Sequence, residues 1–334
     1  MDKPLISVMI LAYNIEEYIE QSVHGALMQE CAYSFEIVIC DDCSTDNTRN
    51  ICERLQQEFP DKIRLIFNEE NKGVIRNYYE TMAQCRGKYV ADCSGDDYWI
   101  DPKKLQMQAD ILEKRNDVVL VFTNWKNYTE EYHHMEDDIK SNRYNTKQQI
   151  LDSSDMKLYL NQKRTSLVNI NSACFRKEET LKIRSGYAHF FNSKYPSEDF
   201  QLIFLMLTQF KIYYLDAETT VYRIRPHSLS KSKDNVRTFD YQYGMAELRF
   251  DLGKQFDVRA NNYVRLQSVE FFKLAYKAKR NDLARKAKEL IYRYGYTLSL
   301  KSKILYYFAS NKVLTGISYP IFCVLKKLKQ QIKS

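Results

Sequence analysis

Residues 88–99 read KYVADCSGDDYW, a short apolar run that ends in two adjacent carboxylates, Asp96 and Asp97. The run has the length of a buried strand. Neighbouring negative charges at the end of such a strand repel each other unless a cation neutralises them. Oxygen ligands in an open, hydrated setting suit Mg²⁺ or Mn²⁺, typically shared with a diphosphate. Ser-Gly-Asp-Asp is also good turn chemistry, so these residues alone leave a solvated turn and a metal site open.

Strands and helices are expected to alternate along the first hundred residues. Apolar runs at 5–11, 35–40, 63–67 and 88–93 are separated by segments with apolar residues at helical spacing. We expect Asn14 to cap the first helix, and Asp101 with Pro102 to begin the fourth. This alternation predicts an α/β fold with a mostly parallel, Rossmann-like sheet flanked by helices.

Polar residues directly follow three of these strands. They are Tyr13 with Asn14, Asp41 with Asp42, and Asp96 with Asp97. Ligands of parallel sheets bind at the carboxyl ends of the strands, so these clusters should share one edge. The chain has neither a G-x-G-x-x-G after its first strand nor a G-x-x-x-x-G-K-[ST], which disfavours dinucleotide binding and P-loop chemistry.

The second part of the chain offers further candidates. A strand is expected at 118–122, followed by a polar loop to residue 149 that contains His133 and His134. Asp199 opens an apolar helix, 200–207, either as a simple cap or as a functional carboxylate. Strands at 211–215 and 220–224 lead into Arg223, Arg225 and His227. These three residues could clamp a diphosphate or form ordinary surface ion pairs.

Charge and cysteine content narrow the partners and the compartment. Of the net charge of +7 on 334 residues, residues 281–334 carry eleven Lys/Arg less two Asp/Glu, or +9, which leaves −2 elsewhere. A basic tail on a near-neutral body favours an anionic surface over a nucleic acid. Asp41 and Asp42 separate Cys40 from Cys43, which disfavours a zinc or redox site. The start of the chain lacks the features of a secretory signal, so we expect a cytoplasmic protein.

The segment 313–325 is uncharged, but its thirteen residues are fewer than the roughly 20 that span a bilayer. Lysines flank it, so it could lie in a membrane interface. An ordinary helical packing module is the alternative.

Taken together, the motifs resemble the family 2 glycosyltransferases of the GT-A fold over about 5–230. The first motif, S-V-x-I-x-x-Y-N, is present at 7–14, and a D-D-G-S-x-D element is present at 41–46. Asp96 with Asp97 matches the D-x-D-type element, and Glu198 with Asp199 matches the family's E-D pair. The resemblance implies an inverting, metal-dependent transfer of a sugar from a nucleotide-sugar.

The resemblance also implies roles for single residues. Leu11, Tyr13 and Asp42 would hold the nucleotide base, with Asn14 in the same motif and Arg76 near the nucleotide. Asp96 would approach the ribose and Asp97 would ligate Mn²⁺ or Mg²⁺ on the diphosphate. Asp199 would be the catalytic base, and Arg223, Arg225 and His227 would contact the diphosphate.

Two departures from the family pattern affect these expectations. Cys43 stands where the D-D-G-S element has glycine. Arg225 stands where the family's Y-R-x-H-x-x-S-x-S motif has histidine, and His227 follows two residues later. A third metal ligand is therefore open, and Arg225 could neutralise the diphosphate directly.

We expect a transferase domain at 1–235, with a nucleotide-binding half at 1–100 and an acceptor half at 101–235. A basic helical region would follow at 236–334. The expected donor is a UDP-sugar and the expected acceptor a saccharide, lipid-linked at the inner face of the cytoplasmic membrane, in the synthesis of a surface polysaccharide. Two alternatives stay open, namely a catalytically silent membrane scaffold and a sugar-nucleotide pyrophosphorylase. The pyrophosphorylase would need a Gly-rich basic loop that residues 11–14 do not offer.

Overall fold

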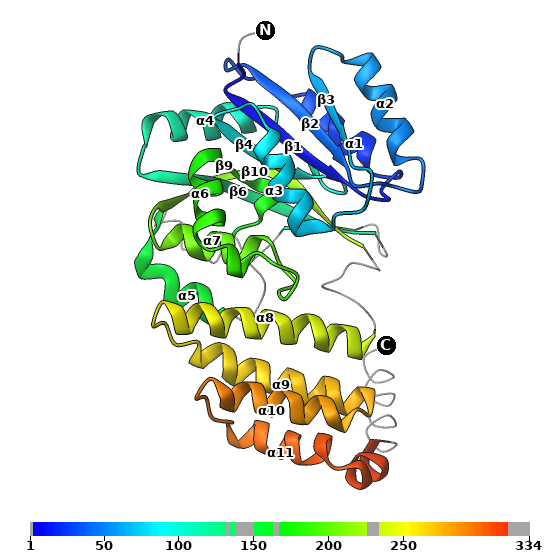
Figure 1. The fold of residues 1–334 in the computed structure, drawn as a ribbon, viewed down its shortest axis with the longest axis vertical. Coiled ribbons are helices and arrows are strands. Elements are labelled where there is room, and N and C mark those ends of the chain that lie inside the picture. Colours follow the sequence, from blue (N-terminus) through cyan, green and yellow to red (C-terminus); the bar gives the residue numbers. More distant parts are fainter. Residues whose placement is uncertain (1–2, 131–133, 138–149, 163–166, 226–233, 320–334) are drawn as a thin grey trace. The chain divides into compact units, whose positions relative to one another are not determined.

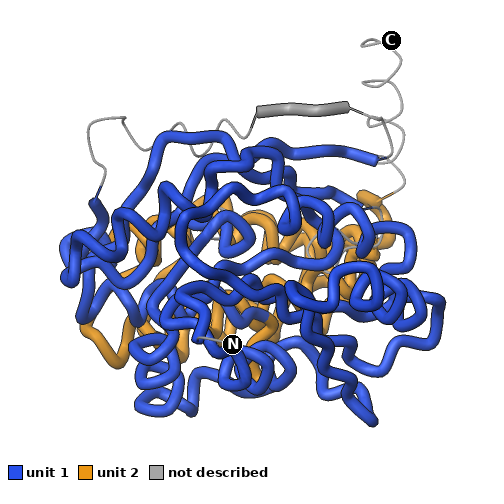
Figure 2. Tube along the Cα trace, turned by 90° about the horizontal axis from the view of Figure 1, so that it is seen from above, with its two compact units in different colours: residues 1–156, 166–193, 197–225 blue, residues 157–165, 194–196, 226–334 orange. Residues whose placement is uncertain are grey.

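A computed structural model describes residues 3–130, 134–137, 150–162, 167–225 and 234–319. The chain forms two compact units, which Figure 2 shows in different colours. Unit 1 comprises residues 1–156, 166–193 and 197–225, and unit 2 comprises residues 157–165, 194–196 and 226–334. The main stretch of the second unit begins at residue 226, ten residues before the start at 236 that we expected from the sequence.

The N-terminal part of unit 1 contains the alternating strands and helices that the sequence predicts. The strands are β1 (Ile6–Ala12), β2 (Phe35–Asp41), β3 (Ile63–Phe67) and β4 (Tyr89–Ser94). The helices between them are α1 (Ile19–Leu27), α2 (Thr48–Glu58) and α3 (Val74–Gln84). The four strands are parallel and lie side by side in the order β3-β2-β1-β4 (Figure 1). The nearly continuous apolar sequences of β1, β2 and β4 are buried on both faces, as a parallel sheet requires, whereas β3 at the edge is mostly half-buried.

The sheet continues beyond β4 as β9-β6-β10-β5. These strands are β5 (Tyr98–Trp99), β6 (Val118–Thr129), β9 (Cys174–Arg176) and β10 (Lys211–Ile224). The short β9 is antiparallel to both β4 and β6, whereas β6 and β10 are parallel to each other. Two further strands pair at the side, β7 (His134–Asp137) with β6 and β8 (Ile150–Leu151) with β10.

Helices fill the connections in this second half of unit 1. They are α4 (Lys104–Lys114), α6 (Lys177–Gly186) and α7 (Asp199–Leu207), with the short 3₁₀ turns η3 (Ser153–Asp155), η4 (Ile170–Ser172) and η5 (Ala188–Phe190). Helix α5 (Met156–Asn161) crosses from unit 1 into unit 2. From Phe200 to Leu207 every residue of α7 is buried, which fits the strongly apolar run there.

Several local expectations were wrong. Asn14 does not cap the first helix, because it adopts a left-handed φ of 50° and α1 begins only at Ile19. Helix α4 begins at Lys104, two residues after the expected Pro102. Strand β6 extends to Thr129, into the expected loop, because its pairing with β10 continues there. His133 lies outside the described residues.

The two strands expected at 211–215 and 220–224 form one strand, β10. Its pairing with β6 is irregular between Leu215 and Thr220, where the sequence shows a polar break. A locally shifted register lets the chain pass through these polar residues without leaving the sheet.

Unit 2 is mainly helical. Its helices are α8 (Asn235–Gln255), α9 (Asn261–Ala278), α10 (Asn281–Arg293) and α11 (Leu300–Ser310). Figure 1 shows them as successive rows, coloured from yellow to red. In the described part of the chain, no helix is both long and apolar enough to cross a bilayer.

Candidate active site

The polar clusters after β1, β2 and β4 lie at the same edge of the sheet. Ala12 pairs with Asp41 across β1 and β2, and Leu11 pairs with Ser94 across β1 and β4. The three strands therefore end level with one another. Asn14 joins two of the loops, since its Oδ1 accepts a hydrogen bond of 2.8 Å from the Thr45 N–H.

Asp42 organises the loop that precedes α3. Its carboxylate is buried and accepts hydrogen bonds from Asn68 Nδ2 (2.7 Å) and from the backbone N–H groups of Lys72 (3.0 Å) and Gly73 (3.0 Å). Gly73 has a φ of 74°, which favours glycine at this turn. The side chain expected to bind a base therefore also shapes the loop beside it.

The other residues expected near a base are more accessible. Tyr13 is 47% exposed and Leu11 is half-buried. Arg76 lies on α3 with an exposed guanidinium, which pairs with Glu80 at 2.7 Å and Glu70 at 3.4 Å. Arg76 is thus held near the Asp42 loop by two carboxylates of its own region.

Asp96 and Asp97 occupy different environments. The Asp97 residue is only 1% exposed, and its oxygens accept hydrogen bonds from Asn171 Nδ2 and from the Arg223 N–H, the latter at 2.8 Å. Burial, followed by the negative charge of Asp96, holds the pKa of Asp97 well above its usual range. The Asp96 side chain is 25% exposed. The more accessible carboxylate is therefore Asp96.

The end of β10 and the residue after it bring two arginines, Arg223 and Arg225, to this pair. Arg225 forms an ion pair of 2.7 Å with Asp96, and Arg223 donates a hydrogen bond of 2.6 Å to the Asp96 carbonyl oxygen. Both guanidinium groups lie over the ring of Tyr18, at 5.1 Å for Arg223 and 5.3 Å for Arg225. His227, the third member of the expected clamp, lies outside the described residues.

Asp199 stands at the first residue of α7. Its Oδ1 accepts a hydrogen bond of 2.6 Å from the Ser197 hydroxyl, which also accepts one of 3.1 Å from the Phe200 N–H. The Ser197 hydroxyl therefore contacts both the Asp199 carboxylate and the backbone of the first turn. Burial raises the pKa of Asp199, against the hydrogen bond from Ser197.

Two other carboxylic acids lie near Asp199. Burial and then Asp199 raise the pKa of Glu198 to about 8. Asp92 is buried within β4, and its burial raises the pKa of its carboxyl to about 7, with a smaller contribution from Asp199. Asp92 belongs to β4, the strand that precedes the acid pair, so the charge of Asp199 acts on a carboxyl of that strand.

Asn171 is a site residue that we did not predict from the sequence. Its side chain bridges the Ser94 hydroxyl, which donates at 2.8 Å, and the Asp97 carboxylate. The next residue of η4, Ser172, accepts a hydrogen bond of 3.1 Å through its carbonyl from the buried ammonium of Lys104. Burial lowers the pKa of Lys104 to about 8. The one sequence feature that could have indicated this arrangement is the position of Lys104 beside Leu105, on the side of α4 that is otherwise expected to be apolar.

A divalent cation would be compatible with this edge. In the described ranges, no group of three or more His, Cys, Asp or Glu side chains is arranged to hold a metal. Mg²⁺ commonly uses one or two protein carboxylates and completes its shell with waters and substrate phosphates, and Asp96 supplies such a carboxylate. A bound diphosphate would thus be needed to complete the site.

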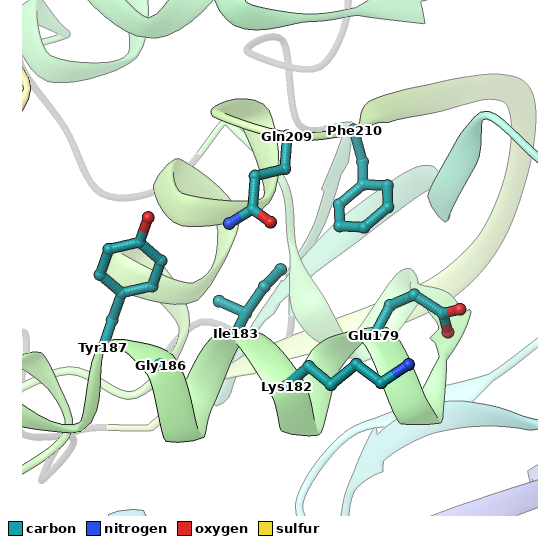
Figure 3. Close-up of a pocket in the computed structure, with 7 residues that line it drawn as sticks. All are labelled: Glu179, Lys182, Ile183, Gly186, Tyr187, Gln209 and Phe210. Carbon is teal, nitrogen blue, oxygen red and sulfur yellow. The ribbon is translucent and has the colours of Figure 1, made fainter.

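A cavity of about 370 Å³ lies elsewhere in unit 1, between α6 and the end of α7 (Figure 3). Tyr187, Gln209 and Phe210 line it together with residues of α6. Phe210 immediately precedes β10, so this cavity lies at the amino end of that strand. It is therefore distinct from the candidate active site at the carboxyl ends.

Comparison with known families and proteins gives a consistent result. The model of "Glycosyl transferase family 2" matches residues 7–177. The chain is 36% identical over 114 residues to the putative teichuronic acid biosynthesis glycosyltransferase TuaG of Bacillus subtilis, which is 34% of this chain and 44% of TuaG. It is also 36% identical over 117 residues to the E. coli UDP-Glc:alpha-D-GlcNAc-diphosphoundecaprenol beta-1,3-glucosyltransferase WfgD, which is 35% of this chain and 44% of WfgD.

An uncharacterized protein of Mycobacterium tuberculosis, Rv1520, is 36% identical over 35% of this chain and 34% of its own length. The aligned stretch thus spans less than half of each of these relatives. Among solved structures, S. aureus TarS 1–349 in complex with UDP-GlcNAc has a TM-score of 0.53 at 14% identity, covering 94% of this chain and 91% of TarS 1–349. The mannosyltransferase PcManGT of Pyrobaculum calidifontis, in complex with GDP-Man and Mn²⁺, also has a TM-score of 0.53 at 14% identity, over 95% of this chain and 87% of PcManGT. These likenesses confirm the predicted GT-A fold.

Proposed function

The chain belongs to glycosyl transferase family 2, and we propose that it is an inverting, metal-dependent transferase that moves a sugar from a nucleotide-sugar to a saccharide acceptor. The observation that carries the proposal is the contact between the acid pair that follows β4 and the carboxyl end of β10. There, two arginines lie against the Asp96–Asp97 pair at the carboxyl edge of the sheet. Departure of a nucleoside diphosphate requires positive charge around its phosphates, and this edge contains such charge.

We propose Asp96, rather than Asp97, as the carboxylate that a metal would share with the diphosphate. Asp96 is partly exposed, whereas the oxygens of Asp97 are already engaged by Asn171 and the Arg223 N–H. When bound, Mn²⁺ or Mg²⁺ would neutralise developing charge on the leaving diphosphate. Arg225 would then exchange its pairing with Asp96 for a contact to phosphate. Arg223 and His227 are the further candidates for that contact.

We propose Asp199 as the catalytic base that takes the proton of the acceptor hydroxyl. A base works best when its pKa approaches the working pH, and the raised pKa of Asp199 is in that direction. Ser197 fixes one carboxylate oxygen of Asp199 by its hydrogen bond and so helps to orient the proposed base. With a single base and attack opposite the leaving group, the anomeric configuration would be inverted.

The donor is proposed to be a UDP-sugar, with its base near Leu11, Tyr13, Asn14, Asp42 and Arg76. The printed names of WfgD and the TarS complex refer to UDP-Glc and UDP-GlcNAc, which supports this choice, whereas the PcManGT complex contains GDP-Man. Asp42 already accepts hydrogen bonds from its own loop, so base binding would add to or replace one of them.

We further propose a lipid-linked saccharide as the acceptor, met at the inner face of the cytoplasmic membrane. The name of WfgD describes a diphosphoundecaprenol-linked acceptor, and that of TuaG refers to teichuronic acid biosynthesis. Surface polysaccharide synthesis is the process to which such an acceptor would belong.

The test begins with thermal stabilisation of the full chain by UDP, GDP and ADP, each with and without Mn²⁺. We expect stabilisation by UDP that increases with Mn²⁺, and UDP release when donor and acceptor are both present. Asp96→Asn should lose the Mn²⁺ effect, and Asp199→Asn should retain UDP binding while losing turnover. If no nucleotide binds, the transferase proposal is rejected and the silent scaffold is favoured.

A further inference from the structure

Helix α11 presents its large apolar side chains to solvent. Leu300, Ile304, Tyr307 and Phe308 are 75%, 52%, 62% and 38% exposed, respectively. Their spacing of four, seven and eight residues from Leu300 places them on one stripe of the helix. In a surface helix such a stripe normally faces the protein core. In α11 the stripe faces the solvent instead.

The contacts on the other side fix this orientation. Ser302 and Ala309 are buried, and the Ser302 hydroxyl shares a hydrogen bond of 2.7 Å with the hydroxyl of Ser268 on α9. Asn281, at the start of α10, donates a hydrogen bond of 2.6 Å to the Ala309 carbonyl oxygen. The small residues of α11 therefore pack inward and cannot exchange places with the apolar stripe without breaking these contacts.

Positive charge borders the stripe on both sides. At 100° per residue, Lys301 falls beyond one margin of the stripe and Lys303 beyond the other, and both are exposed. The sequence has no Asp or Glu from residue 290 onward, while it has eight Lys or Arg there. Val313 and Ile317, on the helical residues that follow, are again exposed and four residues apart, beside Lys312.

An anionic lipid surface suits this combination better than a second copy of the chain. Two copies joined through the stripe would bring lysines against lysines without acids to balance them. In a bilayer interface, apolar side chains enter the boundary between headgroups and acyl chains, and lysines reach lipid phosphates. The ring and hydroxyl of Tyr307 suit the same boundary.

We propose that α11 docks the protein on an anionic lipid bilayer, with Leu300, Ile304, Tyr307 and Phe308 entering the headgroup region and Lys301 and Lys303 contacting lipid phosphates. The helix would lie in the membrane plane. This inference deepens the proposed function, and rests on it in that a lipid-linked acceptor would be met at the same surface.

The test is co-sedimentation of the full chain with phosphatidylcholine vesicles, with and without phosphatidylglycerol. We expect the wild-type protein to bind the anionic vesicles, and the double variant Ile304→Ser/Tyr307→Ser to bind at least about tenfold more weakly. The matched control is Leu158→Ser, which removes an equally exposed apolar side chain of unit 2 outside the stripe. It should bind as the wild type does. Equal thermal unfolding temperatures would show that all variants are folded.

A second arm examines charge and the C-terminal residues. Lys301→Ala/Lys303→Ala should weaken binding to anionic vesicles and reduce its dependence on salt. Removal of residues 320–334 should leave a binding component that Ile304→Ser/Tyr307→Ser abolishes. Unchanged binding by the stripe variant would overturn the proposal. A stripe-dependent dimer in sedimentation velocity, without vesicle binding, would overturn it as well.

The same variants separate this proposal from the transferase proposal. UDP binding, measured as thermal stabilisation, should be equal in the wild type and in Ile304→Ser/Tyr307→Ser. Loss of vesicle binding with UDP binding retained supports the docking role of α11. Vesicle binding by a protein that binds no nucleotide would reject the transferase proposal and leave the docking surface in place.

Discussion

Asp96 and Asp97 are chemically identical neighbours with different surroundings. Strand β10, more than 100 residues later in the chain, supplies the Arg223 N–H to Asp97, while the guanidinium of Arg225 pairs with Asp96 at a more accessible position. One carboxylate therefore has a mainly internal role and the other can reach a ligand.

Substituting each carboxylate by asparagine should separate these roles. Asp97→Asn should lower the free energy of unfolding by about 1–3 kcal/mol, because its new NH₂ group must face the N–H donor of either Asn171 or Arg223. Asp96→Asn should change it by less than about 1 kcal/mol, since the ion pair lost is partly exposed. Urea unfolding measures both. Equal destabilisation by the two variants would contradict the assignment.

Ser197 gives a second prediction at the residue scale. Its hydrogen bond to Asp199 favours the ionised carboxylate, so Ser197→Ala should raise the pKa of Asp199 further. The acidic limb of the pH profile of kcat/KM should then move to higher pH, by about 0.5–1 unit if the bond contributes about 1 kcal/mol. A comparison of wild-type and variant profiles measures the shift. Thr208→Ala, at the other end of α7, is the control and should leave the limb in place.

At the scale of elements, Gly87 lies just before β4, where the chain passes very close to the backbone of β1. A Cβ at this position would lie 2.5 Å from the Ser7 backbone nitrogen and 2.7 Å from the Tyr89 carbonyl oxygen. Gly87→Ala should therefore lower the free energy of unfolding by about 2–3 kcal/mol through displacement of β1 from β4. Gly186→Ala, with no heavy atom within 4 Å, is the matched control and should be neutral or stabilising by up to about 1 kcal/mol. Thermal unfolding of both variants tests the difference.

The elements also show what sequence patterns could predict. The bounds of β3 were predicted to the residue, and β1, β2 and β4 to within one residue at each end, because local apolar runs mark buried parallel strands. The short β5 and β9 were not anticipated as sheet strands. Their two or three residues carry no periodicity, and only their partners in β4, β6 and β10 define them.

In the candidate site, too, features marked by the local sequence were predicted and features that depend on distant residues were not. Its carboxylates and arginines were predicted because each follows a strand or begins a helix. The hydrogen bonds that Asn171 and Lys104 make beneath the site were not predicted. They join segments that are distant in sequence, namely Asn171 with Asp97 and Lys104 with Ser172. The different exposures of Asp96 and Asp97 follow from these same distant contacts, so adjacent identical residues could not reveal them.

For the molecule as a whole, two acids with raised pKa values should make the free energy of unfolding depend on pH. The pKa of Asp92 is raised from 3.8 to about 7 and that of Glu198 from 4.5 to about 8. The folded chain thus binds more protons than the unfolded chain between these values. Their contribution to stability is present below the unfolded pKa values, and is lost as pH rises through about 7 to 8.

Replacing both acids by neutral isosteres should remove this dependence. Relative to wild type, Asp92→Asn/Glu198→Gln should gain stability between about pH 5 and about pH 9, on the order of 1–3 kcal/mol. Urea unfolding at a series of pH values measures the gain. The control is Glu289→Gln at an exposed position on α10, which should show a much smaller change with pH. A constant difference between wild type and the double variant at all pH values would contradict the prediction.

The contacts of Arg223 also have a consequence for synthesis on the ribosome. Arg223 bonds to Gln21, which is 202 residues earlier, and its N–H reaches Asp97 across 126 residues. The first four strands leave the ribosome long before β10 exists, and can begin to pair without it. During that interval the acid pair lacks both the Arg223 N–H and the charge of Arg225. A nascent chain that stops before β10 could therefore form its first four parallel strands, but its acid pair would still lack the contacts of Arg223 and Arg225.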